Sequence, residues 1–297
     1  TAYEISTRDW SSDVCSSDLL AWNLLPQTSR EKNVKFDVWG SVTLGLGATL
    51  FLLAINRGHT WGWLSPYIIG AGVAAVVSFW AFVRIERTTE APLMPLHWLG
   101  NRNLVLPMVI QMLLNFAYMG GFIVVPQMLE NGLGMTAAHI GLLVIARPLS
   151  FSIVAPLGSF FTMRVGERVS AIVGSIGVLA SMVLLSTIRT GAGDLVVILG
   201  LGLSGIGFGI AGPALSALVS NSAPEESIGV AGAMQQLLSQ MGAVLGSTVM
   251  ISMHEMLAGS GPVKSYAYAL LAGAVTCVGA TLVSTRVSST DRSMVTV

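Results

Sequence analysis

Charged residues are scarce in this sequence, and cysteine is nearly absent. Only 10% of the 297 residues are charged, against about 25% in a typical soluble domain. The two cysteines lie far apart, Cys15 in a polar N-terminal segment and Cys277 in an apolar run, which argues against a disulfide framework. Acidic and basic residues balance to a net charge of zero, so we expect no nucleic-acid partner.

Long apolar runs are what the sequence has instead. Hydrophobic residues make up 53% of the chain, and they gather in continuous blocks rather than in the alternating segments of membrane β-strands. A spanning helix needs about 20 apolar residues, and lipid requires the backbone to satisfy its own hydrogen bonds. We therefore predict an all-α fold, a polytopic membrane helical bundle with about eight transmembrane helices. The predicted spans are 38–55, 64–83, 104–129, 138–161, 169–188, 195–219, 228–253 and 266–284.

The distribution of lysine and arginine between these spans predicts the orientation. If the segment before the first span is cytoplasmic, the cytoplasmic connections hold ten of the fifteen basic residues and the outer connections hold three. This asymmetry follows the positive-inside rule. The sequence thus predicts a multi-pass protein of the cytoplasmic membrane, with the lipid bilayer as a partner.

Composition also divides the chain into segments. Residues 1–19 contain the string RDWSSDVCSSDL, which is similar to a translated sequencing adaptor, so we predict a non-native leader there; a native disordered leader is the alternative. The proline-containing connection 84–103 separates two spans from six. The predicted order after the leader is a cytoplasmic segment at 20–37, a linker pair of transmembrane helices at 38–103, a C-terminal six-helix bundle at 104–288 and a tail at 289–297.

Arg147 is the charge that lies deep inside a predicted span. A charge at such depth costs about 2.5–3.5 kcal/mol on insertion scales, so it indicates a functional site by default. Three interpretations stay open. The side chain could extend to the outer interface, or it could donate hydrogen bonds to carbonyls freed by the adjacent Pro148. It could also bind an anionic substrate group or couple to a carboxylate elsewhere.

Two stripes of polar residues occur inside other predicted spans. Gln111, Asn115 and Tyr118 are spaced i, i+4, i+7 and share one helix face, as do Gln236 and Gln240 at i, i+4. Such residues form hydrogen bonds between helices, worth about 0.6 kcal/mol each, or they line a water-accessible cavity. Because both stripes fall in the predicted six-helix bundle that also holds the arginine, we favour a substrate cavity.

Two short motifs are weak. Residues 200–205 match the dinucleotide fingerprint GxGxxG, but they lie inside an apolar helix, where glycines allow close helix contact. Residues 202–205 match the GxSG pattern of intramembrane serine proteases, yet every histidine falls in a connection or at a span end, so Ser204 lacks an evident base. No HExxH motif or cysteine cluster is present. We predict no enzyme activity, no metal site and no cofactor.

Three stretches together resemble the major facilitator superfamily, and within it the 14-helix drug:proton antiporter branch. They are the region from DVWG at 37–40 to WGW at 61–63, the sequence PLGSFFTMRVGER at 156–168, and the glycine- and glutamine-rich stretch 224–246. The resemblance covers the chain from about residue 20 onward. It implies that the chain corresponds to the last eight helices, a linker pair followed by six, and that it is a fragment lacking an N-terminal half.

The resemblance also implies roles for particular residues. It assigns Arg164, Gly166 and Arg168 to a cytoplasmic loop that takes part in conformational change. Two departures stand in that loop, Met163 where an acidic residue is usual and Ser159 where a glycine is usual. The helices that line the central cavity in this family correspond to the spans that carry both polar stripes and the arginine. Proton-coupling carboxylates would lie mostly in the missing half.

The functional hypothesis is a secondary active transporter that exports amphipathic organic compounds by proton antiport. Its partners would be a small-molecule substrate, protons and the missing N-terminal half, and we predict that the fragment alone is inactive. One alternative is a transporter of an anionic metabolite that uses Arg147. Others are an intramembrane serine protease and a scaffold that does not transport.

Overall fold

The computed structural model describes residues 37–89, 98, 100–189, 193–224, 227–261 and 263–288. The predicted leader 1–19, the tail 289–297 and all of the segment 20–37 except Asp37 lie outside these residues. The described residues contain helices and no strand. The helices are α2 (Val38–Trp61), α3 (Pro66–Glu86), α4 (Arg102–Gln127), α5 (Ala137–Val144), α6 (Ala146–Val165), α7 (Glu167–Ser186), α8 (Asp194–Ser222), α9 (Ile228–Met256) and α10 (Lys264–Ser284), with a π-turn η2 (Met128–Gly132) and a 3-10 turn η4 (Ala258–Ser260).

The prediction of an all-α membrane bundle is confirmed. Each predicted run coincides with a long helix, except that the fourth run forms two helices, α5 and α6. In the described part of the chain, seven helical segments are long and apolar enough to span a membrane, with α5 and α6 counted as one. The remaining long helix, α9, is 29 residues long but less apolar, because three glutamines lie in its middle.

Local sequence signals explain where several helices begin and end. The side chain of Asp37 accepts a hydrogen bond from the backbone N–H of Gly40 at 2.8 Å and caps α2. Asn101 caps α4 in the same way through the N–H of Asn103. α3 begins at Pro66, where a missing N–H removes no helical hydrogen bond.

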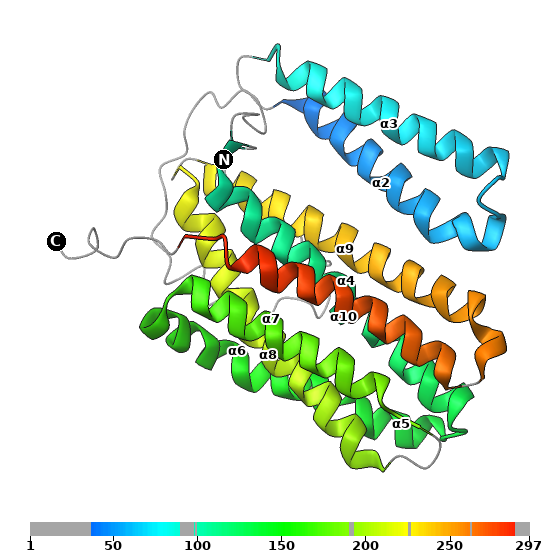
Figure 1. Ribbon diagram of the computed structural model, residues 1–297. Coiled ribbons are helices and arrows are strands. Elements are labelled where there is room, and N and C mark those ends of the chain that lie inside the picture. Colours follow the sequence, from blue (N-terminus) through cyan, green and yellow to red (C-terminus); the bar gives the residue numbers. More distant parts are fainter. Residues whose placement is uncertain are drawn as a thin grey trace, which may run out of the picture. The chain divides into compact units, whose positions relative to one another are not determined.

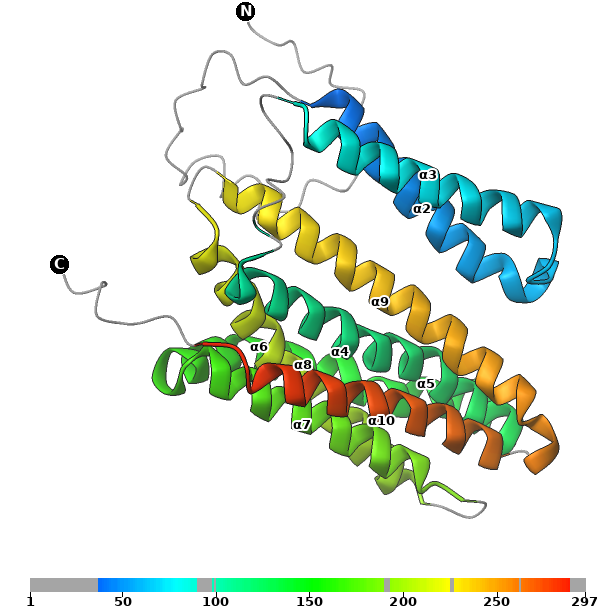
Figure 2. The same ribbon diagram turned by 45° about the horizontal axis from the view of Figure 1, so that its top comes forward.

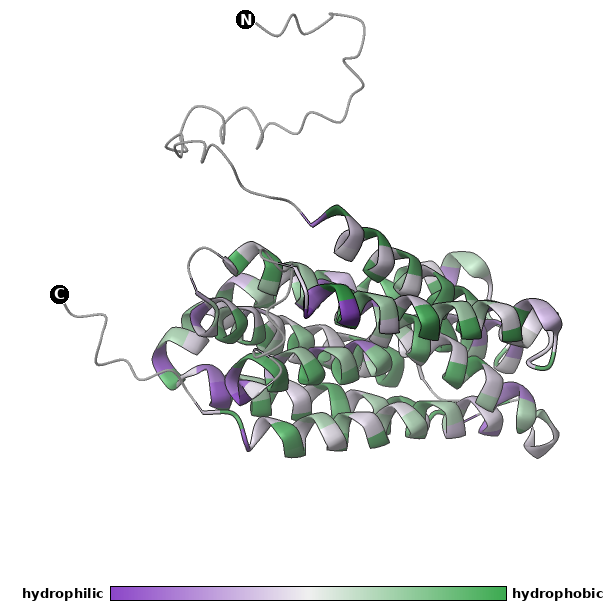
Figure 3. Ribbon diagram, turned by 90° about the horizontal axis from the view of Figure 1, so that it is seen from above, coloured by the Kyte–Doolittle hydropathy of each residue, from purple (hydrophilic) through white to green (hydrophobic). Residues whose placement is uncertain are grey.

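α4 is the most buried of the spanning helices in the described residues. It packs against α9, α10, α8 and α7, and its most apolar stretch is 61% buried. α8 packs against α6 and α7, while α2 packs against α3 and α9. Figures 1 and 2 both show α9 between α2 and α4. Hydrophobic residues continue along most of the length of the helices (Figure 3), as a lipid environment requires.

Glycines bring the central helices close together. A Cβ atom added at Gly246 of α9 would lie 2.0 Å from the carbonyl oxygen of Phe116 on α4, and one at Gly205 of α8 would lie 2.3 Å from that of Arg147 on α6. At Gly207 of α8 the nearest atom would be the backbone nitrogen of Val178 on α7, at 2.6 Å. Close approach of backbones at small residues is typical of membrane helix pairs. The 200–205 glycines therefore serve helix packing.

Candidate functional site

Arg147 lies at a break between two helices. α5 ends at Val144 and α6 begins at Ala146, and Pro148 has no N–H to donate to the carbonyl of Val144. The helical ladder resumes with the hydrogen bond from the N–H of Leu149 to the carbonyl of Ile145, at 3.1 Å. The arginine is thus in the first turn of a new helix in mid-span, and its side chain is only 1% exposed.

The guanidinium of Arg147 bonds to two neighbouring helices. Its Nε donates to the Oγ of Ser204 on α8 at 2.8 Å, and its Nη1 donates to the backbone carbonyl of Tyr118 on α4 at 2.9 Å. The hydroxyl of Ser204 donates in turn to the carbonyl of Leu201. The third nitrogen, Nη2, is buried and has no hydrogen-bond partner. The two N–H groups of Nη2 therefore have no acceptor in the interior.

Aromatic rings surround the same guanidinium. Its central carbon lies 4.7 Å from the ring centroid of Tyr118 and 6.0 Å from that of Phe122, within the range of cation–π attraction. The Tyr118 ring stacks on Phe208 of α8, with centroids 4.5 Å apart. Among the described residues, no carboxylate forms an ion pair with Arg147. The charge is stabilised by two oxygen acceptors and by aromatic faces.

These contacts exclude two of the three interpretations of Arg147. The side chain is held between α4 and α8, so it does not extend to the outer interface. Its backbone acceptor is the carbonyl of Tyr118 on another helix rather than one freed by Pro148. A role in binding an anionic group stays a prediction.

The structure separates the other predicted cavity residues. Asn115 is buried and donates to the hydroxyl of Ser239 on α9. Gln111 is also buried, and its Oε1 has no partner. Gln236 and Gln240 lie on an exposed face of α9. Tyr118 is the predicted residue that contacts Arg147 directly.

Sequence reasoning missed three participants in this cluster. Ser204 was noticed only as part of a protease-like pattern, and its hydroxyl in fact accepts from Arg147. Phe122 lies one helical turn after Tyr118, so the i, i+4 spacing could have placed its ring on the same face. Phe208 lies one turn after Ser204 on α8 and could have been found in the same way.

Of the three predicted loop residues, Gly166 lies between α6 and α7, while Arg164 is in the last turn of α6 and Arg168 is in the first turn of α7. Gly166 has φ +94°, a region in which residues other than glycine are strained. Its N–H donates to the carbonyl of Thr162 at 2.9 Å, and its carbonyl accepts from the N–H of Ser170 at 3.2 Å. Arg164 and Arg168 are exposed on either side. Gly166 therefore makes the tight helix reversal possible, while a role for the two arginines in conformational change stays a prediction.

Comparison with known proteins supports a transport family. The sequence matches the model of the Major Facilitator Superfamily over residues 38–247 and again over 108–293. It is 31% identical over 220 residues to the tetracenomycin C resistance and export protein of Streptomyces glaucescens, covering 72% of this chain and 40% of that protein. It is 23% identical over 218 residues to the multidrug transporter protein MdtP of Bacillus subtilis, covering 73% and 40%.

This chain matches a larger share of a third relative. The tetracycline resistance determinant of Streptomyces rimosus is 26% identical over 230 residues, which are 73% of this chain and 63% of that protein. The chain spans about 40% of the length of the first two relatives.

Proposed function

This chain belongs to the major facilitator superfamily, and from that membership we propose that it forms the C-terminal part of a transporter that exports amphipathic organic compounds by proton antiport. Transport, rather than enzymatic catalysis, is the activity of this family and of the first two relatives described above. The proposal places the chain in the 14-helix branch, with α2 and α3 as the linker pair and α4 to α10 as one half of the transporter.

The observation that supports export is the similarity of this chain to drug transport and resistance proteins. The relatives named above are a resistance and export protein, a multidrug transporter and a resistance determinant, and each similarity extends over more than two thirds of this chain. In the Arg147 cluster, two aromatic rings lie against a buried cation. Such surroundings suit organic substrates that have both aromatic and polar parts.

We expect proton coupling to use carboxylates that do not lie in the centres of the described helices. Asp37, Glu130, Glu167, Asp194 and Glu255 all lie near helix ends. Proton relays in transporters use ionisable residues within the membrane. We therefore expect the coupling carboxylates in further helices of the transporter, in keeping with the share of the relatives' length that this chain covers.

Transport in proteoliposomes tests the proposal. The transporter that contains this chain is reconstituted, and accumulation of a cationic dye such as ethidium is followed under an imposed pH gradient. We expect accumulation that collapses when a protonophore dissipates the gradient. Accumulation that ignores the gradient would overturn proton antiport, and no flux of any amphipathic compound would overturn drug export. Residues 20–297 reconstituted alone should give no flux.

An anionic substrate is the second candidate, and the buried Nη2 of Arg147 without a partner favours it. An anion reaching this nitrogen would find a donor that no protein group satisfies. Replacing Arg147 with methionine keeps a long side chain but removes the charge, and replacing it with lysine keeps the charge but not the planar fork. If anions are the substrates, Arg147→Met should abolish anion flux and leave ethidium flux unchanged. Equal loss of both fluxes would contradict this candidate.

A further inference from the structure

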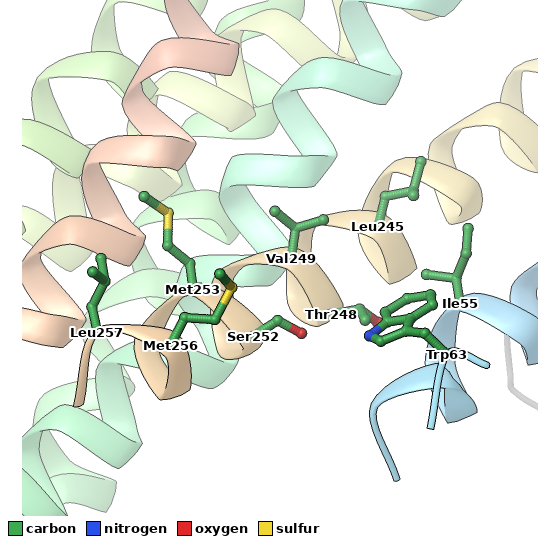
Figure 4. A pocket seen from close by; sticks show the side chains of 9 residues that line it. All are labelled: Ile55, Trp63, Leu245, Thr248, Val249, Ser252, Met253, Met256 and Leu257. Atoms are coloured by element: carbon green, nitrogen blue, oxygen red, sulfur yellow. The ribbon is translucent and has the colours of Figure 1, made fainter. Parts of the chain in front are cut away.

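A hollow lies away from the Arg147 cluster, between α9 on one side and α2 with the turn that follows it on the other. Its volume is about 660 Å³, within the range of roughly 300–1,000 Å³ that is typical of small-molecule pockets. Figure 4 shows Trp63 and Ile55 on one side and a face of α9 on the other. The lining contains no charged residue. An occupant would therefore be uncharged over most of its surface.

The position of Trp63 is set by the backbone. Gly62, with φ +83°, turns the chain at the end of α2, and the N–H of Ser65 donates to its carbonyl at 3.0 Å. The Trp63 ring then folds back onto Gly58, where an added Cβ would lie 2.6 Å from ring carbons. The indole is 54% exposed, and it points across the hollow toward Thr248 (Figure 4). A turn thus presents an aromatic face to this space.

The wall on α9 combines flexible apolar side chains with hydroxyls. Met253 and Met256 can adapt to different shapes because the thioether chain is unbranched. Ser252 lies one turn after Thr248, and its Oγ is buried without a hydrogen-bond partner. Hydroxyls in membrane helices commonly bond to a carbonyl one turn earlier, as Thr281 does to the carbonyl of Cys277 at 2.8 Å. Ser252 does not, so its hydroxyl is free to bond to an occupant once the side chain turns toward the pocket.

From these features we propose that the hollow is a binding site for a neutral, elongated amphiphile with one hydrogen-bonding head group. The apolar body packs on the two methionines and the indole of Trp63, while the head group bonds to Ser252 and Thr248. The site is separate from the Arg147 cluster. It takes molecules that partition into the bilayer, and it excludes ions because no charged side chain compensates them.

Photolabelling of the purified transporter tests this site. The probe is hexadecanol that carries a diazirine, used in nanodiscs of phosphatidylcholine. We expect the crosslink on α9 between Leu245 and Leu257, and unlabelled hexadecanol should compete for it. Diazirine derivatives of hexadecanoic acid and of a hexadecyl quaternary ammonium should label this segment about tenfold less, since each brings an uncompensated charge into an apolar site.

Two variants and a control sharpen the assignment. The double variant Thr248→Val, Ser252→Ala should weaken hexadecanol competition about three- to tenfold, the value of a lost hydrogen bond. Met253→Trp should fill the space and remove labelling, and Val275→Trp, at a position 70% exposed on α10, should not. Thermal unfolding of each variant confirms that it folds.

Equal labelling by all three probes would overturn the proposal. So would labelling that occurs in detergent but disappears in nanodiscs, because bilayer acyl chains would then be the occupant.

Discussion

The α2–α3 pair and α4 have similarly apolar sequences, but they differ in how much of their surface other helices bury. The most apolar stretch of α4 is 61% buried by protein, and those of α2 and α3 are each 17% buried. Three glycines of the pair differ in the same way from a glycine of α4. Gly45, Gly70 and Gly72 on the pair have no atom within 4 Å of an added Cβ, whereas Gly120 on α4 has Met250 and the backbone of Gly246 within 3.0 Å. In lipid, hydropathy does not distinguish protein-facing from lipid-facing helices, and the presence of glycine does not either; only the contacts made at each glycine do.

The largest expected effect comes from one methyl group at the α4–α9 contact. In Gly246→Ala the new Cβ would meet the carbonyl of Phe116 at 2.0 Å, and backbone on both sides cannot move aside. We expect a loss of about 3 kcal/mol in unfolding free energy, at the upper end of overpacking effects. The matched control Gly72→Ala on α3 meets nothing and should raise it by up to about 1 kcal/mol, because alanine favours the helix more than glycine does. Unfolding in mixed micelles measures both, and equal losses would contradict the comparison.

A smaller loss is expected when the Arg147 cluster loses one acceptor. Ser204→Ala leaves the Nε of Arg147 buried without a partner, since Ser204 Oγ accepts from it at 2.8 Å. An unsatisfied buried donor costs about 1–3 kcal/mol. The control is Thr43→Val on α2, whose hydroxyl bonds only within its own helix, to the carbonyls of Trp39 and Gly40. If both variants unfold alike, the cluster does not stabilise the bundle.

The contact between Asn115 and Ser239 should contribute less again. These side chains join α4 to α9, and such bonds average about 0.6 kcal/mol in membrane proteins. A double-mutant cycle with Asn115→Ala and Ser239→Ala isolates the coupling energy from the other effects of each substitution. A coupling energy near zero would show that these two groups do not interact in the folded protein.

The smallest effect on stability is expected at the exposed glutamines of α9. Gln236→Ala and Gln240→Ala should change the unfolding free energy by less than about 0.5 kcal/mol, because neither side chain is buried in the described bundle. If they line a substrate cavity, dye transport by the complete transporter should nevertheless fall. Stability loss without transport loss would mean that this face packs against protein and has no part in transport.

The comparison also explains which features could be predicted from the sequence. The long helices and their approximate ends follow from apolar runs, from Asp37 and Asn101 as caps and from Pro66 at a helix start. The partners of each face do not follow, because lipid and protein interiors are equally apolar. Gln236 and Gln240 illustrate this, since their i, i+4 spacing correctly gives one shared face but does not say what the face meets.

The break before Arg147 could be predicted only in part from the sequence. Pro148 predicts a disturbed ladder, but a continuous run at 138–161 gave no reason to expect two separate helices. The polar neighbours of Arg147 could not be predicted either. Ser204 lies 57 residues away, and its approach depends on the contact between α6 and α8 at Gly205, where tertiary packing rather than local spacing sets the distance.

At the junction between α5 and α6 one helical hydrogen bond is missing, while Ile145 keeps the helical dihedrals φ −57° and ψ −27°. Pro148 leaves no hydrogen bond to break between Val144 and the following turn, so a change of angle there leaves both helical ladders intact. α6 approaches α8 closely at Gly205, and α5 adds Ile140 and Leu143 to the buried core besides the exposed pair His139 and Asp194, 2.8 Å apart. The missing hydrogen bond therefore lies within three residues of the buried guanidinium, between two segments that are both packed against the bundle.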